Sequence, residues 1–282
     1  MTVAGVAATS DVGRAWRVRG ATLTLDAPRL FGILNVTPDS FSDGGDFLSR
    51  DAAVAHGECL AAEGAEVIDV GGESTRPQGA VPVSAAEECA RVLPVVRELA
   101  RRLPGTLLSV DTVKSEVAHA ALSEGAHIVN DVSGGRLDVA MAETCARHGA
   151  GFVIMHSRGS VRDMATFAHA VYDDLVTDVI AELRLRVAEA RAAGVAPDAI
   201  VLDPGIGFAK RTADSLAVLA AIPRLAAVGF PILVGASRKR FVGELTGVAT
   251  PAERVFGTVG AHVAALMRGA AMFRVHDVRA AR

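Results

Sequence analysis

The chain has 282 residues, half of them apolar, and a formal net charge of −3 at pH 7, so it can bury one large core and gives no electrostatic reason to expect nucleic acid or an anionic membrane as a partner. No apolar run approaches the roughly 18 residues of a membrane helix, and Met1 to Gly13 lacks the basic and apolar regions of a secretory signal. Cys59, Cys89 and Cys145 are scattered in alanine-rich surroundings, which indicates reduced core residues of a cytoplasmic protein and not a zinc site or a disulfide frame.

Residues 16–25 alternate apolar and polar side chains, which predicts a short β hairpin within an N-terminal extension over residues 1–30. After it, one unit recurs: a glycine, usually followed by alanine, leads into a short apolar run that ends in a polar residue. The glycine is typical of a left-handed helix cap, and the run is typical of a strand buried on both faces. Eight strands are expected, near residues 31–36, 66–72, 107–111, 127–132, 151–156, 200–204, 231–236 and 271–277.

Helices are expected in the gaps between these runs, including residues 172–193. Ser84 with Glu87, and Thr250 with Glu253, have capping-box spacing. Strand–helix alternation predicts a parallel sheet, and eight strands predict its closure into a (β/α)8 TIM barrel, so residues 1–282 are expected to form one domain. The sequence ends at Arg282, directly after the eighth run, so the last helix is expected to be absent from it. An open doubly wound sheet is the alternative, weakened because no Gly-x-Gly-x-x-Gly follows the first strand.

In a parallel barrel, polar residues at the carboxyl ends of the strands converge on one mouth. Any single one of them has an ordinary structural explanation, such as a helix cap. Eight strands that all contribute indicate a site, because a buried polar group without a partner costs about 1–3 kcal/mol. The converging residues are Asn35, Asp69, Glu73, Asp111, Asn130, Asp131, His156, Asp203, Ser237 to Lys239, Arg274 and His276.

These residues suit two kinds of chemistry. A flat heterocycle with ring N–H, amino and carbonyl groups is matched by Asp111, Asn130, Asp203 and Lys239. An anion such as a phosphate is matched by Arg274, His276, Asn35 and the Ser74-Thr75-Arg76 segment. Glycine-jointed residues 41–45 and 71–77 are expected to be mobile lids. No His-x-x-x-His or Cys-x-x-Cys pair occurs, whereas a magnesium ion held by one amide oxygen and ligand phosphates is compatible.

Seven motifs stand in one order along residues 31–277: Asn35 to Gly45, Gly71 to Pro77, Ser109 to Thr112, Asn130 to Gly134, Asp203 to Gly205, Ser237 to Lys239, and Arg274 to Asp277. Each is weak alone, but together they resemble the dihydropteroate synthase family. The resemblance implies a transferase of folate biosynthesis that joins 6-hydroxymethyl-7,8-dihydropterin pyrophosphate to 4-aminobenzoate, by dissociative C–O cleavage and amine attack. It also implies a magnesium cofactor, a homodimer and a sulfonamide target.

The resemblance also implies a role for each matching residue. The pterin is expected to contact Asp111, Asn130, Met155, Asp203, Phe208 and Lys239. The pyrophosphate is expected to contact Asn35, Arg76, Arg274 and His276, with Asn35 also a magnesium ligand. The 4-aminobenzoate is expected to contact Phe41, Thr75, Arg76, Pro77 and Ser237. The catalytic set is Asp43, which faces the developing pterin cation, with Asn35, Lys239, Arg274 and His276.

The chain departs from the family pattern at Gln78, an apparent insertion in the second lid, at Ala209 in place of a usual glycine, and at Ser157, where methionine is common. Two alternatives are a folate-binding methyl-transfer domain, which shares the pterin residues, and a catalytically silent paralogue that binds pterin. A methyl-transfer domain would not need the lid that contains Phe41. A silent paralogue is expected to have lost lid residues.

Overall fold

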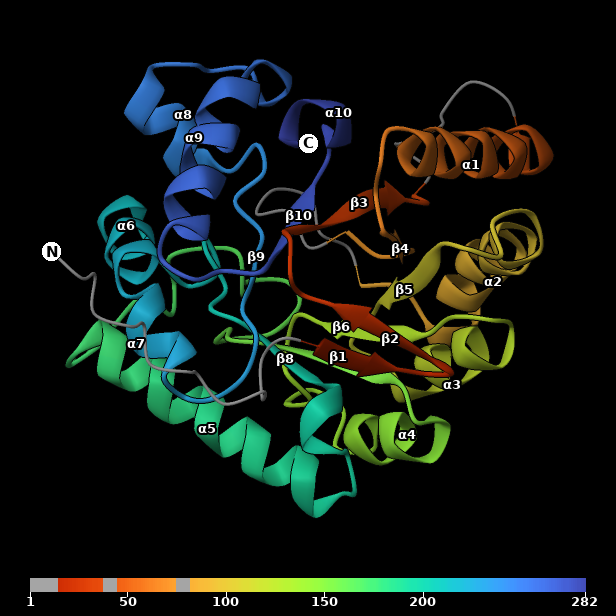
Figure 1. Ribbon diagram of the computed structural model, residues 1–282, viewed down its shortest axis with the longest axis horizontal. Coiled ribbons are helices and arrows are strands. Elements are labelled where there is room, and N and C mark those ends of the chain that lie inside the picture. The colour runs from red at the N-terminus through yellow and green to blue at the C-terminus, as the bar shows by residue number, and fades with distance from the viewer. Residues whose placement is uncertain (1–14, 38–44, 75–81) are drawn as a thin grey trace, which may run out of the picture.

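The computed structural model describes residues 15–37, 45–74 and 82–282. Its main sheet has eight parallel strands in the order β8-β7-β6-β5-β4-β3-β10-β9, and an isolated parallel bridge from Leu202 to Ile232 joins the two outer strands (Figure 1). The predicted TIM barrel is therefore confirmed. The strands are β3 (Arg29–Asn35), β4 (Val67–Gly71), β5 (Leu107–Asp111), β6 (Ile128–Asp131), β7 (Gly151–Met155), β8 (Ile200–Asp203), β9 (Leu233–Val234) and β10 (Met272–Val275).

The observed strands lie inside the predicted ranges except β3, which starts two residues earlier. The largest difference is β9, which has two residues where six were expected. Proline has no backbone N–H, so Pro231 can only accept in the ladder, and it does so from the Leu202 N–H at 3.0 Å. The other strands stop where their polar residues begin to turn into the loops of the mouth.

Helices surround the barrel (Figure 1). They are α1 (Gly45–Ala62), α2 (Ala85–Arg102), α3 (Ser115–Ser123), α4 (Met141–His148), α5 (Leu175–Ala192), α6 (Thr212–Ala220), α7 (Ile222–Ala226), α8 (Arg240–Thr246) and α9 (Val255–Leu266), and one turn, α10 (Val278–Ala281), follows β10. Two 3-10 turns, η2 (Pro197–Ala199) and η3 (Pro251–Glu253), precede β8 and α9. The glycine cap is confirmed at Gly149, which ends α4 with a φ of 60°.

One of the two expected helix starts is confirmed and the other is wrong. Ser84 caps α2, and its Oγ accepts a hydrogen bond from the Glu87 N–H at 3.2 Å. Thr250 makes no side-chain cap, and the residues after it form only η3. The chain bends there around the Arg254 side chain, which donates to the carbonyls of Val248 and Arg238 at 2.9 and 3.0 Å. Helix α9 begins only after that bend.

The predicted hairpin forms from β1 (Ala15–Val18) and β2 (Ala21–Thr24), which pair antiparallel and lie across the barrel (Figure 1). Its Trp16 side chain is fully buried, stacks on Phe31 with ring centroids 6.0 Å apart, and donates from Nε1 to the Ala199 carbonyl at 2.8 Å. Trp16 and Val18 pack with one inward residue from each of several strands in a separate apolar cluster. This cluster forms the floor of the barrel and leaves the carboxyl ends of the strands as its mouth.

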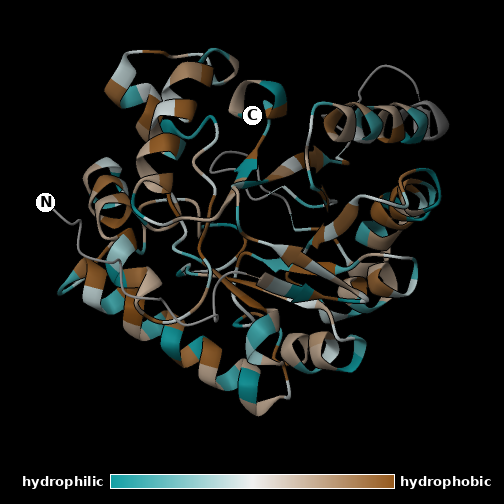
Figure 2. Cartoon of the chain, in the orientation of Figure 1, coloured by the Kyte–Doolittle hydropathy of each residue, from teal (hydrophilic) through white to brown (hydrophobic). Residues whose placement is uncertain are grey.

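Apolar residues also remain on the outside of the barrel. On α8 and α9, Phe256 is 90% exposed and Met267, just after α9, is 79% exposed, with Leu245, Val263 and Leu266 nearby in sequence. Figure 2 shows brown, apolar ribbon along both helices. Within the described ranges, no helix combines the length and the apolar character needed to cross a membrane.

Candidate functional site

The polar residues expected at the mouth come from the ends of neighbouring strands. The parallel register pairs Asn35 with Gly71, Gly71 with Asp111, and Asp111 with Asn130, so β3 to β6 present these residues at one level. On β7 and β8 the register pairs Met155 with Asp203. Since parallel strands in register end together, one rim carries both halves of the expected set.

Arg274, expected to bind an anion, contacts a residue of the group expected to bind a flat heterocycle. Its Nε lies 2.5 Å from Asp69 Oδ2 and its Nη2 lies 2.6 Å from Asp111 Oδ2. Asn130 Nδ2 donates to the same Asp69 oxygen at 3.0 Å. A residue expected to bind an anion is thus an ion-pair partner of a residue expected to bind the heterocycle. These four side chains, from β4, β5, β6 and β10, are called the arginine cluster below.

Burial controls the charge of this cluster. It raises the pKa of Asp111 to about 7, and the adjacent guanidinium of Arg274 opposes that shift. The pKa of Arg274 is raised, because Asp69 and Asp111 stabilise its charge by more than burial penalises it. Asp69 Oδ1 is buried and has no hydrogen-bond partner among the described residues. One carboxylate oxygen of the cluster is therefore buried and unpaired among the described residues.

A second group lies around the loop that follows β8. Asp203 Oδ1 accepts from the Gly205 N–H at 2.7 Å, and Lys239 donates to the Ile206 carbonyl and stands 4.3 Å from the centroid of the Phe208 ring. Burial raises the pKa of Asp203 and lowers that of Lys239 to about 8, while the attraction between the two opposes both shifts. Met155 and Phe208 belong to one small apolar cluster. A flat ring could therefore meet a carboxylate and an ammonium beside an apolar wall.

Glycine is required at the turn of this loop. Gly205 has a φ of +67°, and a Cβ atom there would lie 1.9 Å from the His156 carbonyl oxygen. The backbone of the loop is therefore pressed directly against the end of β7, where the His156 N–H also donates to the Asp203 carbonyl at 2.9 Å.

The third group follows β9 and β10. Ser237 Oγ lies 2.9 Å from His276 Nδ1 and accepts from the His276 backbone N–H at 3.1 Å. Arg238 has a φ of 58°, rare for a residue with a side chain, and its guanidinium pairs with Asp277 at 2.5 and 2.9 Å. The expected contacts of 4-aminobenzoate and of pyrophosphate, Ser237 and His276, are thus direct neighbours.

The structure brings the expected residues together in three groups. Asp111, Asn130 and Arg274 belong to the arginine cluster, and Asp203, Phe208 and Lys239 lie around the loop after β8. Ser237 contacts His276, and Asn35 is half-buried at the end of β3. Five expected residues lie outside the described residues: Phe41, Asp43, Thr75, Arg76 and Pro77. The Gln78 position lies outside them too.

Asp69 was expected at the mouth but without a ligand to bind, and Lys210 was not predicted to belong to the site. Asp69 was recognisable as the one charged residue inside the apolar run of β4, and it is fully buried. Lys210 follows a glycine-rich stretch, and its sequence context alone carried no signal of burial. Residues such as these are identified only when distant strands are brought together.

The family model of pterin binding enzymes matches residues 31–276. The dihydropteroate synthase of Mycobacterium leprae is 48% identical over 263 residues, which cover 92% of this chain and 91% of that protein. Among solved structures, the dihydropteroate synthase of Xanthomonas albilineans with 4-aminobenzoic acid has a TM-score of 0.88 at 46% identity, and the match covers 95% of this chain and 94% of that one. The enzyme of Thermus thermophilus in complex with 6HMPPP has a TM-score of 0.81 at 43% identity, over 95% of this chain and 96% of that one. The chain belongs to the dihydropteroate synthase family of pterin binding enzymes.

Proposed function

We propose that the mouth of the barrel is where this dihydropteroate synthase joins 6-hydroxymethyl-7,8-dihydropterin pyrophosphate to 4-aminobenzoate, forming 7,8-dihydropteroate and pyrophosphate. The arginine cluster supports this most, because two carboxylates lie within hydrogen-bond distance of a guanidinium and an amide donates to one of those carboxylates. Such a set can bind the amino and ring N–H groups of a pterin and, next to them, a phosphate. The Xanthomonas albilineans enzyme has also been solved in complex with 7,8-dihydropteroate.

The pterin is proposed to lie against Met155 and Phe208. Asp111, Asn130 and Asp203 would accept from and donate to its edges, and Lys239 would meet a ring carbonyl or nitrogen. Because Arg274 neutralises Asp111 in this structure, pterin binding would replace that ion pair with hydrogen bonds from the ligand. The Nη2 end of the guanidinium would then be able to bind pyrophosphate, while its Nε remains paired with Asp69.

Cleavage is proposed to be dissociative. Heterolysis of the bond between the pterin methylene and the pyrophosphate oxygen gives a delocalised pterin cation and a highly charged leaving group. Arg76, Arg274 and His276 would stabilise the leaving group, and Asp43 would face the cation. The aromatic amine is neutral at pH 7, so it can attack without a dedicated general base. Arg76 and Asp43 are assigned from the family resemblance.

Magnesium is proposed as the cofactor, with Asn35 as its protein ligand. No group of three His, Cys, Asp or Glu side chains suited to a metal occurs in the part of the chain that the structure describes. Asn35 offers one amide oxygen at the end of β3, and Mg²⁺ is commonly held by few protein ligands together with phosphates and water. The donor set therefore fits, and a bound ion would neutralise charge on the pyrophosphate.

The 4-aminobenzoate is proposed to bind beside Ser237, with Phe41, Thr75, Arg76 and Pro77 completing its site. Ser237 is almost fully buried and contacts His276, so the amine would arrive next to the departing pyrophosphate. Direct attack on the exposed methylene carbon requires this proximity.

Residues 1–282 are proposed to act as one pterin-binding domain that forms a homodimer in the cytoplasm. The exposed apolar side chains of α8 and α9, Phe256 above all, support a second copy of the chain as partner, since such patches mark interaction surfaces. Free thiols at Cys59, Cys89 and Cys145 are consistent with a reducing compartment.

The test is pyrophosphate release from the pterin pyrophosphate, measured with and without 4-aminobenzoate and with and without magnesium. Release that requires all three components is expected. A silent paralogue would bind the pterin in calorimetry and release nothing. A methyl-transfer domain would instead bind a methylated folate and take no part in pyrophosphate release, and either result would overturn the proposal.

A further inference from the structure

Lys210 is a buried lysine that the reaction described above does not use. Its side chain is 1% exposed, and it follows the loop of residues 205–209 directly before α6. No carboxylate oxygen among the described residues lies within 4.0 Å of its ammonium group. An ammonium that is buried without an ion pair is costly, and burial lowers the pKa of Lys210 to about 7. Packing alone therefore does not explain why a lysine occupies this buried position.

Two hydrogen bonds account for its position. Its Nζ lies 2.8 Å from His156 Nδ1 and donates to the Phe208 carbonyl at 3.1 Å. A protonated ammonium has only donors, so His156 Nδ1 is the acceptor and the proton of the neutral imidazole is on Nε2. Burial and the neighbouring charge of Lys210 lower the pKa of His156 to about 4, which agrees with a neutral ring.

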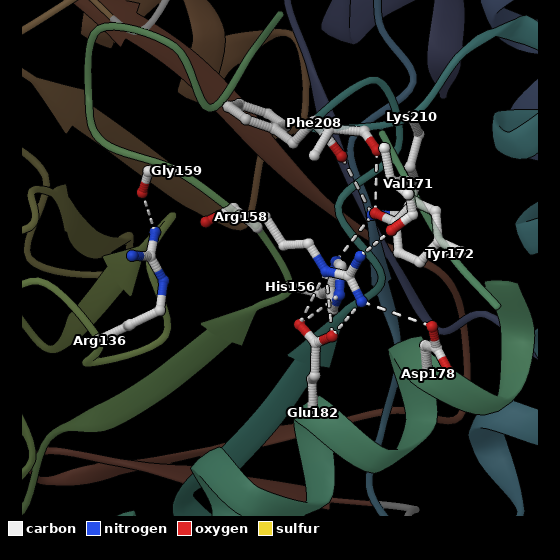
Figure 3. A network of polar contacts seen from close by, with 12 residues as sticks. Arg136, His156, Arg158, Gly159, Val171, Tyr172, Asp178, Glu182, Phe208 and Lys210 are labelled. Carbon is white, nitrogen blue, oxygen red and sulfur yellow. Dashed lines mark hydrogen bonds and ion pairs between the residues drawn. The ribbon is translucent and has the colours of Figure 1, made fainter. Parts of the chain in front are cut away.

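The chain of contacts continues to α5. His156 Nε2 lies 3.1 Å from Glu182 Oε2, and Glu182 is paired with Arg158. Figure 3 shows this row of residues, from Phe208 through Lys210 and His156 to Glu182. Tyr172 ties the same loop separately, because its hydroxyl donates to the Ala209 carbonyl at 2.9 Å. Helix α5, which lies outside the barrel, is thus connected to the loop that begins at the pterin site.

The two ends of that loop are residues proposed to bind the pterin. Asp203 ends β8 just before the loop and Phe208 lies near the end of the loop, while Gly205, its first residue, is pressed against the backbone at the end of β7. Lys210 fixes the Phe208 carbonyl directly. Its charge also lowers the pKa of Asp203, as the charges of Lys239 and Arg274 do, against the rise caused by burial. One ammonium therefore acts on both ends of the loop.

We propose that Lys210 is a positioning residue for pterin recognition: its hydrogen bond to the Phe208 carbonyl and its Nζ, which would lie 3.5 Å from a Cβ atom at Gly205, hold the loop of residues 205–209 in place next to Asp203. This inference rests on the proposed function of the site, because it assumes that Asp203 and Phe208 bind the pterin. Lys210 itself touches no substrate and takes no part in bond cleavage.

The test compares Lys210→Met with Tyr172→Phe. The first variant removes the charge and both hydrogen bonds from the loop, and the second removes one hydrogen bond from the same loop without changing charge. For Lys210→Met we expect KM for the pterin pyrophosphate to rise about tenfold or more, with KM for 4-aminobenzoate at saturating pterin within about twofold of wild type. Tyr172→Phe is expected to keep both values within about twofold. Thermal unfolding of each variant is recorded alongside.

A second variant at the same position is included in case Lys210→Met fails to fold. Lys210→Gln keeps a neutral donor, so its pterin KM is expected to lie between those of wild type and Lys210→Met. A pterin KM near the wild-type value in both Lys210 variants would overturn the proposal, and so would an equal rise in Tyr172→Phe. If the wild type releases no pyrophosphate, the proposed function fails, and calorimetric affinity for the pterin in the same variants still decides the role of Lys210.

Discussion

Asp203 occupies the end of β8 with one oxygen committed to the Gly205 N–H and with Lys239 as its main source of stabilising charge. Among the described residues, its second oxygen makes no hydrogen bond or ion pair, so a ligand can use it. A charge-assisted hydrogen bond to a pterin N–H is therefore the natural use of this carboxylate.

Asp203→Asn is expected to weaken binding of the pterin by about 1.5–3 kcal/mol, because hydrogen bonds to charged groups contribute about that much. Isothermal calorimetry with the pterin pyrophosphate measures the change. Asp198→Asn, which alters an exposed carboxylate that pairs only with Arg17 on the surface, serves as the control. Affinity equal to that of wild type would remove Asp203 from the site.

Ala209 is the departure from the family pattern that the structure explains best. Its φ is 45°, in the left-handed region that favours glycine, so the family glycine suits the backbone and alanine is held there under strain of about 1–2 kcal/mol. The Ala209 N–H donates to the Met164 carbonyl at 2.8 Å, and Tyr172 binds its carbonyl oxygen. These two hydrogen bonds hold the conformation that the side chain opposes.

At the scale of an element, the β1–β2 hairpin contributes to stability through one large side chain. Trp16→Ala is expected to lower the free energy of unfolding by about 3–5 kcal/mol, because it leaves a cavity in the floor and an unpaired carbonyl at Ala199. Urea unfolding followed by circular dichroism measures this. Arg17→Ala, one residue along the same strand, removes a surface ion pair and is expected to cost no more than about 1 kcal/mol. Similar losses in both variants would contradict the role of Trp16 in the floor.

Helix α9 carries a buried histidine, His262, at the end of β9. Its Nε2 accepts from the Ala236 N–H at 3.3 Å, and burial, with a smaller effect of Lys239, lowers its pKa to about 4. A histidine with a lowered pKa in the folded state contributes stability that is present above about pH 6.5, its unfolded value, and is lost as the pH falls towards 4.

His262→Gln is therefore expected to flatten the acid side of the stability profile. Between pH 6.5 and 4, wild type should lose on the order of 3 kcal/mol more than the variant, since each unit of pKa shift is worth about 1.4 kcal/mol. Chemical unfolding at a series of pH values measures the difference. His56→Gln, on the exposed side of α1, is the control, and a variant that loses stability in parallel with wild type would show that His262 is not the group responsible.

At the scale of the whole molecule, the apolar surface of α8 and α9 predicts self-association. Phe256→Glu is expected to convert a dimer into a monomer, because a charge would be placed in the proposed interface. Sedimentation velocity measures the change in mass. Val139→Glu alters a side chain that is 91% exposed before α4 and is expected to leave the mass unchanged. A wild-type monomer, or a dimer in both variants, would contradict the interface.

The order and type of the barrel elements were predictable because most strands are short apolar runs that follow a glycine, whereas β3 was recognisable from its apolar run alone. Strand lengths were less predictable, as β9 shows. How many ladder hydrogen bonds form near Pro231 depends on the neighbouring strands, which the local sequence does not specify. The site was predictable as a set of strand ends but not as a set of contacts. Arg274 and Asp69 are 205 residues apart in the sequence and come into contact on either side of β3, and no local sequence pattern predicts that contact. The burial of Lys210 depends in the same way on His156, 54 residues away.

A barrel that is closed at one end by packed side chains can admit and release ligands only at the other end. With Trp16 and Val18 seated against the amino-terminal ends of the strands, incoming amine and outgoing diphosphate have to use the same opening. The pyrophosphate is proposed to form beside Arg274 and His276, close to the proposed site of the amine. We therefore expect each round to begin only after the previous pyrophosphate has left, so that its release contributes to the rate of turnover.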